Sequence, residues 1–134
     1  MDKNGRYNHI EDVLAQLHAG QWFGWSDSTN KVYANLIIQP KVYDQTYTGT
    51  VHEDSFINNP HSKPSEISLT DALAKQQSDY DAREYSRNRA SAYPSTGDQW
   101  DMIYKDNKNS TTTHADAVEA VKTKWPKDNS GPVE

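Results

Sequence analysis

Histidines and carboxylates are the residues of this chain best suited to acid–base or metal chemistry. There are five histidines, His9, His18, His52, His61 and His114. The first two are nine residues apart in one expected helix, so they point in unrelated directions, and no H-E-x-x-H or H-x-H pattern occurs. Glu53 and Asp54 adjoin His52 in an expected loop, whereas a hydrolytic carboxylate pair is held about 5–10 Å apart in a cleft. We therefore expect no metal site, no cofactor and no catalytic residues.

Other catalytic chemistries lack their usual sequence signatures. The chain has no cysteine, so it has neither a thiolate nucleophile nor a disulfide framework. It has no G-x-S-x-G motif, and its six glycines are scattered rather than gathered in a phosphate-binding loop. We predict that the protein is not an enzyme.

A short aromatic stretch is better suited to a partner surface. Trp22, Phe23 and Trp25 fall within four residues that have strand character. Since successive side chains of a strand point to opposite faces, the three cannot all enter one core. We predict that at least one of them is exposed and contacts a partner.

A cluster of arginines is a second candidate for a partner surface. Arg83, Arg87 and Arg89 lie within two turns of an expected helix, and the first two share a face because they are four residues apart. One interpretation is a contact with an anion or a partner. The other is a solvated helix face on which these side chains pair with Asp79 and Glu84.

The composition limits the core and the kinds of partner. Hydrophobic residues make up 34% of the chain, against about 45–50% in typical globular proteins, and the mean hydropathy is -1.02. Such a chain buries a thin core and is expected to gain stability by packing on a partner. The net charge of -5 comes from interspersed acidic and basic residues, which argues against nucleic-acid binding. The longest apolar run, residues 36–38, and the polar N-terminus predict neither a membrane helix nor a signal peptide.

The elements that position these residues begin with a small α+β unit at residues 1–43. Asn8 and Glu11 have capping-box spacing, and a helix is predicted to follow and to end near Gly20. Residues 21–25 and 31–39 are predicted to form a hairpin. The helix is expected to bury one stripe, made of Ile10, Val13, Leu14 and Leu17.

A loop or linker is predicted at residues 44–66 and a helical module at residues 67–127. A long helix is expected to about residue 92, a second one is capped by Ser95, and a third one starts near Thr112. Residues 128–134 are expected to be a flexible tail. The predicted core of the module is Trp100, Ile103, Tyr104, Val118, Val121 and Trp125. The fold class is therefore α+β, a helix plus β-hairpin unit followed by a helical hairpin or arm.

The second half of the chain resembles a module of tailed-phage proteins. The pattern is an arginine-bearing helix at residues 81–89, a Tyr-Pro-Ser turn at residues 93–95 and an Asp-Gln-x-Asp-x-x-Tyr helix at residues 98–104. The module ends in Val-Lys-x-Lys-Tyr-Pro-Lys, and residues 121–127 carry this ending with Trp125 in place of the tyrosine. The likeness covers about residues 66–127. The chain departs from the module at Trp100, where leucine is more common, and at residue 105, where histidine often follows the tyrosine.

The first half is similar to segments that precede this module in marine and cyanobacterial phage virion proteins. The likeness lies in Trp-Phe-Gly-Trp at residues 22–25 and Val-Tyr-Ala-Asn-Leu at residues 32–36. The resemblance implies a virion structural protein without enzymatic activity, made in the host cytoplasm. Its partners would be other virion proteins, with multiple copies on the particle. We expect docking on the tail, neck or fibre attachment region. Alternatives are a capsid-surface decoration protein and a cytoplasmic chaperone for tail-fibre assembly.

Overall fold

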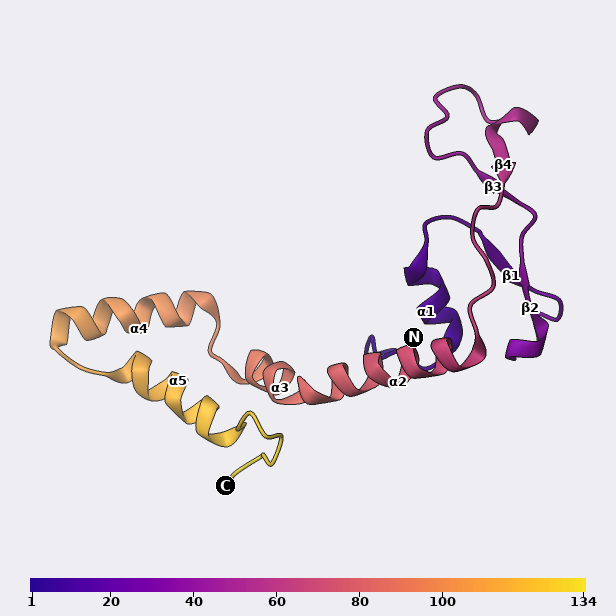
Figure 1. The fold of residues 1–134 in the computed structure, drawn as a ribbon. Helices are drawn as coiled ribbons and strands as arrows, with labels where there is room; N and C mark the ends of the chain where they lie inside the picture. The colour runs from indigo at the N-terminus through magenta and orange to yellow at the C-terminus, as the bar shows by residue number, and fades with distance from the viewer. The chain divides into compact units, whose positions relative to one another are not determined.

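The computed structural model describes all of residues 1–134 and confirms an α+β fold (Figure 1). The helices are α1 (Ile10–Leu17), α2 (Glu66–Ala82), α3 (Glu84–Ala92), α4 (Thr96–Asn109) and α5 (Thr113–Lys124). The strands are β1 (Phe23–Trp25), β2 (Leu36–Ile38), β3 (Lys41–Tyr43) and β4 (Phe56–Asn58). The chain forms two compact units, Met1–Gln77 and Ser78–Glu134, called here the N-terminal and C-terminal units.

Helix α1 is capped by a histidine rather than by the predicted Asn8. The Nδ1 atom of His9 accepts a hydrogen bond from the backbone N–H of Glu11 at 3.0 Å. The carboxylate of Asp12 accepts from the backbone N–H of His9 at 3.2 Å, which completes a capping box. The capped helix buries three of the four residues of the predicted stripe, Ile10, Val13 and Leu14.

The predicted first hairpin is present, with shorter strands. Strand β1 pairs antiparallel with β2, and Gly24 lies opposite Ile37. Residues 33–35 form a turn of 3-10 helix instead of extending β2. The side-chain amide of Asn35 donates to the carbonyl of Asn30 at 2.8 Å, and the backbone N–H of Asn35 donates to the carbonyl of Val32 at 2.9 Å. Such local bonds compete with the ladder of a strand.

A second hairpin lies partly within residues 44–66, where a loop or linker was expected. Strand β3 pairs antiparallel with β4, and Val42 lies opposite Ile57. Each strand has only three residues. The isolated pair would be marginal in water, so it depends on its attachment to the rest of the unit.

Residues after β4 are bonded back to the first hairpin. The side-chain amide of Asn59 donates to the carbonyls of Trp22 and Gln39, both at 2.8 Å. The ammonium of Lys63 donates to the carbonyl of Leu36 at 2.8 Å. These contacts keep the segment in the N-terminal unit, so the boundary between the units falls after Gln77, inside α2, rather than at residues 44–66.

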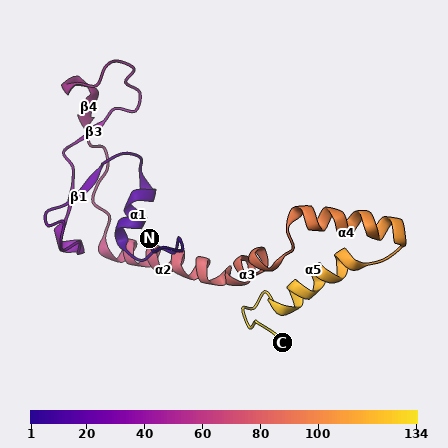
Figure 2. The ribbon, with the colours of Figure 1, turned by 180° about the vertical axis from the view of Figure 1, so that it is seen from behind.

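All the buried hydrophobic side chains gather in one core of the N-terminal unit. Trp22 is 0% exposed, and its indole N–H donates to the carbonyl of Leu14 at 3.2 Å. Helix α1 lies beside β1 and over the first turns of α2 in both views (Figures 1 and 2). The core consists of Ile10, Val13, Leu14, Trp22, Leu36 and Leu69.

The C-terminal unit contains the predicted helical hairpin. Helices α4 and α5 lie side by side (Figure 1). Ser95 caps α4 as predicted, since its hydroxyl oxygen accepts from the N–H of Asp98 at 3.1 Å. The long helix expected to residue 92 is divided at Arg83, where the backbone leaves helical geometry. The amide oxygen of Asn129 accepts from the N–H of Tyr85 at 2.7 Å and so supports the start of α3.

The C-terminal unit has no buried core. No side chain of residues 78–134 is buried, and every buried side chain of the chain lies within residues 10–69. The helices of this unit therefore contact one another through half-buried side chains only. The apolar burial that stabilises a small domain is thin here, and a partner that covered the unit would stabilise it.

Candidate functional site

Three exposed, large apolar side chains of the C-terminal unit form a stripe along α4. Trp100 is 71% exposed, Tyr104 is 64% exposed and Ile103 is 41% exposed. Their spacing of three and four residues places them on one face of the helix. We call these three residues the α4 stripe. A contiguous apolar face of this kind is typical of a site of protein–protein interaction.

Polar contacts on an adjacent face of α4 set the orientation of the stripe. The side chain of Gln99 bonds to the carbonyl of Pro94 at 2.8 Å and to Nε2 of His114 at 3.0 Å. Asp106, seven residues further along α4, accepts from the N–H of Thr113 at 3.0 Å and from that of His114 at 2.8 Å. These bonds turn Gln99 and Asp106 toward α5. Ile103 is four residues after Gln99 and three before Asp106, so it borders the face that meets α5, while Trp100 and Tyr104 lie further round the helix and are more exposed.

Asp106 is the residue that joins the two helices of the hairpin most directly. Its carboxylate receives two of the unpaired N–H groups at the start of α5, where the helix dipole also favours negative charge. These bonds, together with one from the hydroxyl of Thr111, lower its pKa to about 2. Asp106 lies seven residues before Thr113, outside the usual capping spacing, so this contact could not be predicted from the sequence.

A row of four charged residues lies beside Tyr104, on the side of α4 opposite Ile103. Asp98, Asp101, Lys105 and Lys108 follow a spacing of three, four and three residues, and all four are exposed. Lys105 and Asp101 form an ion pair of 2.7 Å within the helix, which raises the pKa of the lysine. The acidic pair lies toward the N-terminus of α4 and the basic pair toward its C-terminus.

The prediction that Trp100 is a core residue is wrong, and so is the same assignment for Ile103 and Tyr104. Helical spacing correctly placed the three on one face, but that face is the outer one because the polar residues of α4 bind α5. The core residues predicted on α5 agree better with the structure, since Val118, Val121 and Trp125 are half-buried.

Two of the three clustered arginines bind other residues of the C-terminal unit. The guanidinium of Arg87 donates to the carbonyl of Tyr80 at 2.7 Å and lies over its ring at 3.7 Å. The Nε atom of Arg89 donates to the carbonyl of Trp125 at 2.8 Å, at the end of α5. These two side chains hold the unit together. Arg83 is exposed and remains a candidate for a partner contact.

The prediction for the aromatic residues at positions 22–25 is also partly wrong. Trp22 was a candidate for partner binding, but it is fully buried at the centre of the core. Phe23 and Trp25 are half-buried and pack around that core. Strand alternation predicted that the three would differ in environment, but it could not show which of them faces inward.

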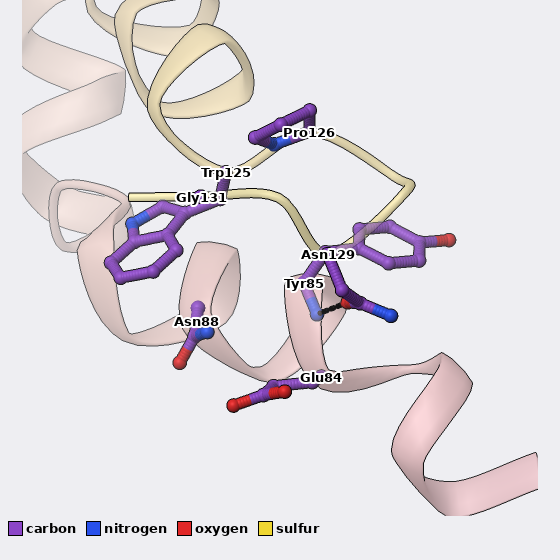
Figure 3. A pocket seen from close by; sticks show the side chains of 7 residues that line it. All are labelled: Glu84, Tyr85, Asn88, Trp125, Pro126, Asn129 and Gly131. Carbon is purple, nitrogen blue, oxygen red and sulfur yellow. Dashed lines mark hydrogen bonds between the residues drawn. The ribbon is translucent and has the colours of Figure 1, made fainter. Parts of the chain in front are cut away.

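The end of the chain packs against α3 and α5, where a flexible tail was predicted. The N–H of Val133 donates to the carbonyl of Lys124 at 2.8 Å, and a Cβ at Gly131 would lie 2.4 Å from the same oxygen. A hollow of about 10 Å³ remains, with the Trp125 indole next to Asn88 (Figure 3). It has room for about one water molecule. Its lining is Glu84, Tyr85, Asn88, Trp125, Pro126, Asn129 and Gly131.

The N-terminal unit has a larger hollow, of about 220 Å³, between the end of α1 and the second sheet. Its lining includes Gly20, Val42, Thr46, Ile57 and His61. Small-molecule sites are usually about 300–1,000 Å³. No group of three or more acidic or histidine side chains is placed to hold a metal ion, and no helix has the length and apolar character needed to cross a membrane.

Two histidines stack at the edge of the core. The rings of His18 and His61 are 3.5 Å apart with an angle of 8° between them, and both lie edge-on to Trp22. Burial lowers the pKa of His61, and the neighbouring His18 lowers it further. Two imidazolium rings at this separation would repel each other.

Acidification is therefore expected to destabilise the N-terminal unit. A histidine whose pKa is lower in the folded state than in the unfolded state stabilises the fold at pH values above its unfolded-state pKa of about 6.5. This stabilisation is lost as the pH falls below that pKa. The protection factors of the α1 amides, which correct for the slower intrinsic exchange at lower pH, should fall between pH 7.5 and pH 5.5. His61→Gln should reduce this fall, with His114→Gln as the control. An equal fall in His61→Gln and the parent would contradict the role of the stack.

Comparisons with protein-family models, with curated proteins and with solved structures give no match for this chain.

Proposed function

We propose that this protein is a non-enzymatic structural component of a tailed-phage particle and that it docks through the α4 stripe. The observation that supports docking best is that the C-terminal unit exposes large apolar side chains and buries none. Its largest aromatic residue on α4, Trp100, is 71% exposed, while no side chain of the unit is buried. A partner that covers the stripe would supply the apolar burial that the unit lacks.

The roles of the histidines agree with a structural protein. His9 caps α1, His52 caps a 3-10 turn, His18 and His61 stack on each other, and His114 bonds to Gln99. Each ring therefore has an intramolecular contact that accounts for its position. The phage context comes from the resemblance of residues 66–127 to the tailed-phage module. Within that context, the tail, neck or fibre attachment region is the proposed location.

Mass spectrometry of purified virions tests this proposal. We expect the protein in the particles at a level comparable to that of the other structural proteins, and in the tail fraction after heads and tails are separated. Recovery in the head fraction would favour a capsid decoration protein. Presence in the infected cell together with absence from purified particles would contradict the proposal and favour an assembly chaperone.

A further inference from the structure

The break between α2 and α3 holds a side chain from the segment that follows α5. In a continuous helix the backbone N–H of Tyr85 would donate to the carbonyl of Asp81, four residues earlier. Here the carboxamide of Asn129 lies between these two groups. Its oxygen accepts from the N–H of Tyr85 at 2.7 Å (Figure 3). Its amide donates to the carbonyl of Asp81 at 3.4 Å and to that of Ala82 at 3.3 Å. A side chain inserted into the hydrogen-bond ladder of a helix produces a kink.

The local sequence gives no reason for a break at this point. Residues 80–87 contain neither glycine nor proline, and Ala82, Arg83 and Glu84 all have favourable helix propensity. The backbone of Arg83 has φ -97° and ψ 13°, in the bridge region that adjoins the helical one. A modest rotation would therefore return it to helical geometry. The break depends on contacts from outside the two helices.

We infer that Asn129 is a latch, and that its release joins α2 and α3 into one continuous helix. Without the carboxamide, the N–H of Tyr85 can bond to the carbonyl of Asp81. The carbonyl of Ala82 can in the same way accept from the N–H of Ser86. Bonds of the helix then replace the bonds of the latch, so the backbone groups at the break stay satisfied. This change of conformation does not depend on docking through the α4 stripe.

A turn after α5 directs Asn129 into the break. Its N–H donates to the carbonyl of Pro126 at 3.1 Å, and its φ of 60° lies in the left-handed region, which asparagine tolerates better than most residues. Gly131 fits close to the end of α5, where an added Cβ would clash with the carbonyl oxygen of Lys124. We call residues 126–133, which carry the latch, the strap.

The strap is held by few contacts, which suits a segment that opens. None of its side chains is buried. The indole N–H of Trp125, at the hollow beside the strap, is buried without a hydrogen-bond partner. A buried donor of this kind costs free energy, and release of the strap would admit water to it. A partner that binds the released strap would shift the chain toward the continuous helix.

Two variants release the latch by different routes. Asn129→Gly removes the carboxamide and places glycine, which adopts a positive φ without strain, at φ 60°. Gly131→Ala keeps the carboxamide and displaces the strap, because the added Cβ meets the carbonyl oxygen of Lys124. Ser110→Gly is the matched control, since Ser110 also has a positive φ, of 56°, and lies at the end of α4, outside the strap.

The measurement is NMR of the whole isotope-labelled chain. Scalar couplings across hydrogen bonds identify the acceptor of the Tyr85 N–H, and Cα chemical shifts show whether Arg83 is helical. In the parent and in Ser110→Gly, the N–H should couple to the side-chain carbonyl of Asn129, and Arg83 should be outside the helical range. In both release variants we expect loss of this coupling, a coupling to the carbonyl of Asp81 in its place, and a helical shift at Arg83.

Three results would overturn the inference. The first is a parent chain in which the Tyr85 N–H already couples to the carbonyl of Asp81. The second is a release variant in which Arg83 keeps its non-helical shift although the bond to Asn129 is lost. The third is a loss of helical shifts throughout residues 78–92 in both release variants. That loss would mean that the strap supports the two helices instead of separating them.

Discussion

Trp22→Ala is expected to lower the free energy of unfolding of the N-terminal unit by about 3–5 kcal/mol. The indole is fully buried and is the largest side chain of the core, so its removal leaves a cavity among Leu14, Leu36 and Leu69. It also leaves the Leu14 carbonyl without the 3.2 Å bond from the indole N–H. A loss of this size is a large part of the total stability of a small domain.

The measurement is denaturant unfolding of the whole chain, followed by hydrogen exchange of amides in α1 and β2. Trp25→Ala is the matched control, because its side chain is half-buried at the rim of the same core. It should cost clearly less than Trp22→Ala. Equal losses in the two variants would show that Trp22 is not the centre of the core.

Trp100→Ala, in contrast, is expected to weaken binding to the partner and to leave the fold intact. Most of the Trp100 surface faces solvent, so truncation leaves no internal cavity and should change the free energy of unfolding by about 0.5 kcal/mol or less. Aromatic anchors at the centre of an interface commonly contribute about 2 kcal/mol or more, which corresponds to roughly a thirtyfold loss of affinity. Tyr104→Ala, one turn away on the same face, should weaken docking in the same direction.

A control on the same helix separates docking from helix stability. Asp106→Ala removes the carboxylate that receives the first N–H groups of α5. It should loosen the hairpin, which faster amide exchange at the start of α5 would reveal, without removing any residue of the stripe. A Trp100→Ala variant that exchanged like Asp106→Ala would mean that Trp100 supports the fold instead.

Local signals in the sequence predicted most of the elements. The apolar spacing of Ile10, Val13 and Leu14 predicted α1, and Ser95 followed by Asp98 predicted the start of α4. Both signals act within one turn of a helix, so they depend little on the rest of the chain. The exact cap of α1 was missed because histidine is not among the usual capping residues.

The orientation of α4 could not be predicted in the same way. Its sequence has two faces with helical spacing, one with Trp100 and Tyr104 and the other with Gln99 and Asp106. Hydrophobicity alone favours turning the aromatic face inward. The bonds of Gln99 and Asp106 to the start of α5 reverse that choice, and they join residues 7–15 positions apart. Contacts at such a separation depend on how two helices meet, which periodicity within one helix does not describe.

The break at Arg83 and the boundary at Gln77 have a similar origin. No glycine or proline marks either position in the sequence. The amide of Asn129 bonds to the N–H of Tyr85 from 44 residues away, and Asn59 joins the segment after β4 to the carbonyl of Trp22 from 37 residues away. The candidate site was therefore only partly predictable. The shared face of its three residues follows from spacing, and their exposure follows from long-range contacts.

Incorporation of Trp100→Ala into virions tests the central claim most directly. Parent and variant chains carrying the same tag would be supplied separately in cells infected by the phage that, on our proposal, encodes this protein, and tagged protein would be quantified in purified particles. We expect the parent chain in the particles, and the folded variant in the cell lysate with an amount per particle that is lower by up to about thirtyfold. A variant incorporated as well as the parent would contradict the claim that the α4 stripe is the docking surface.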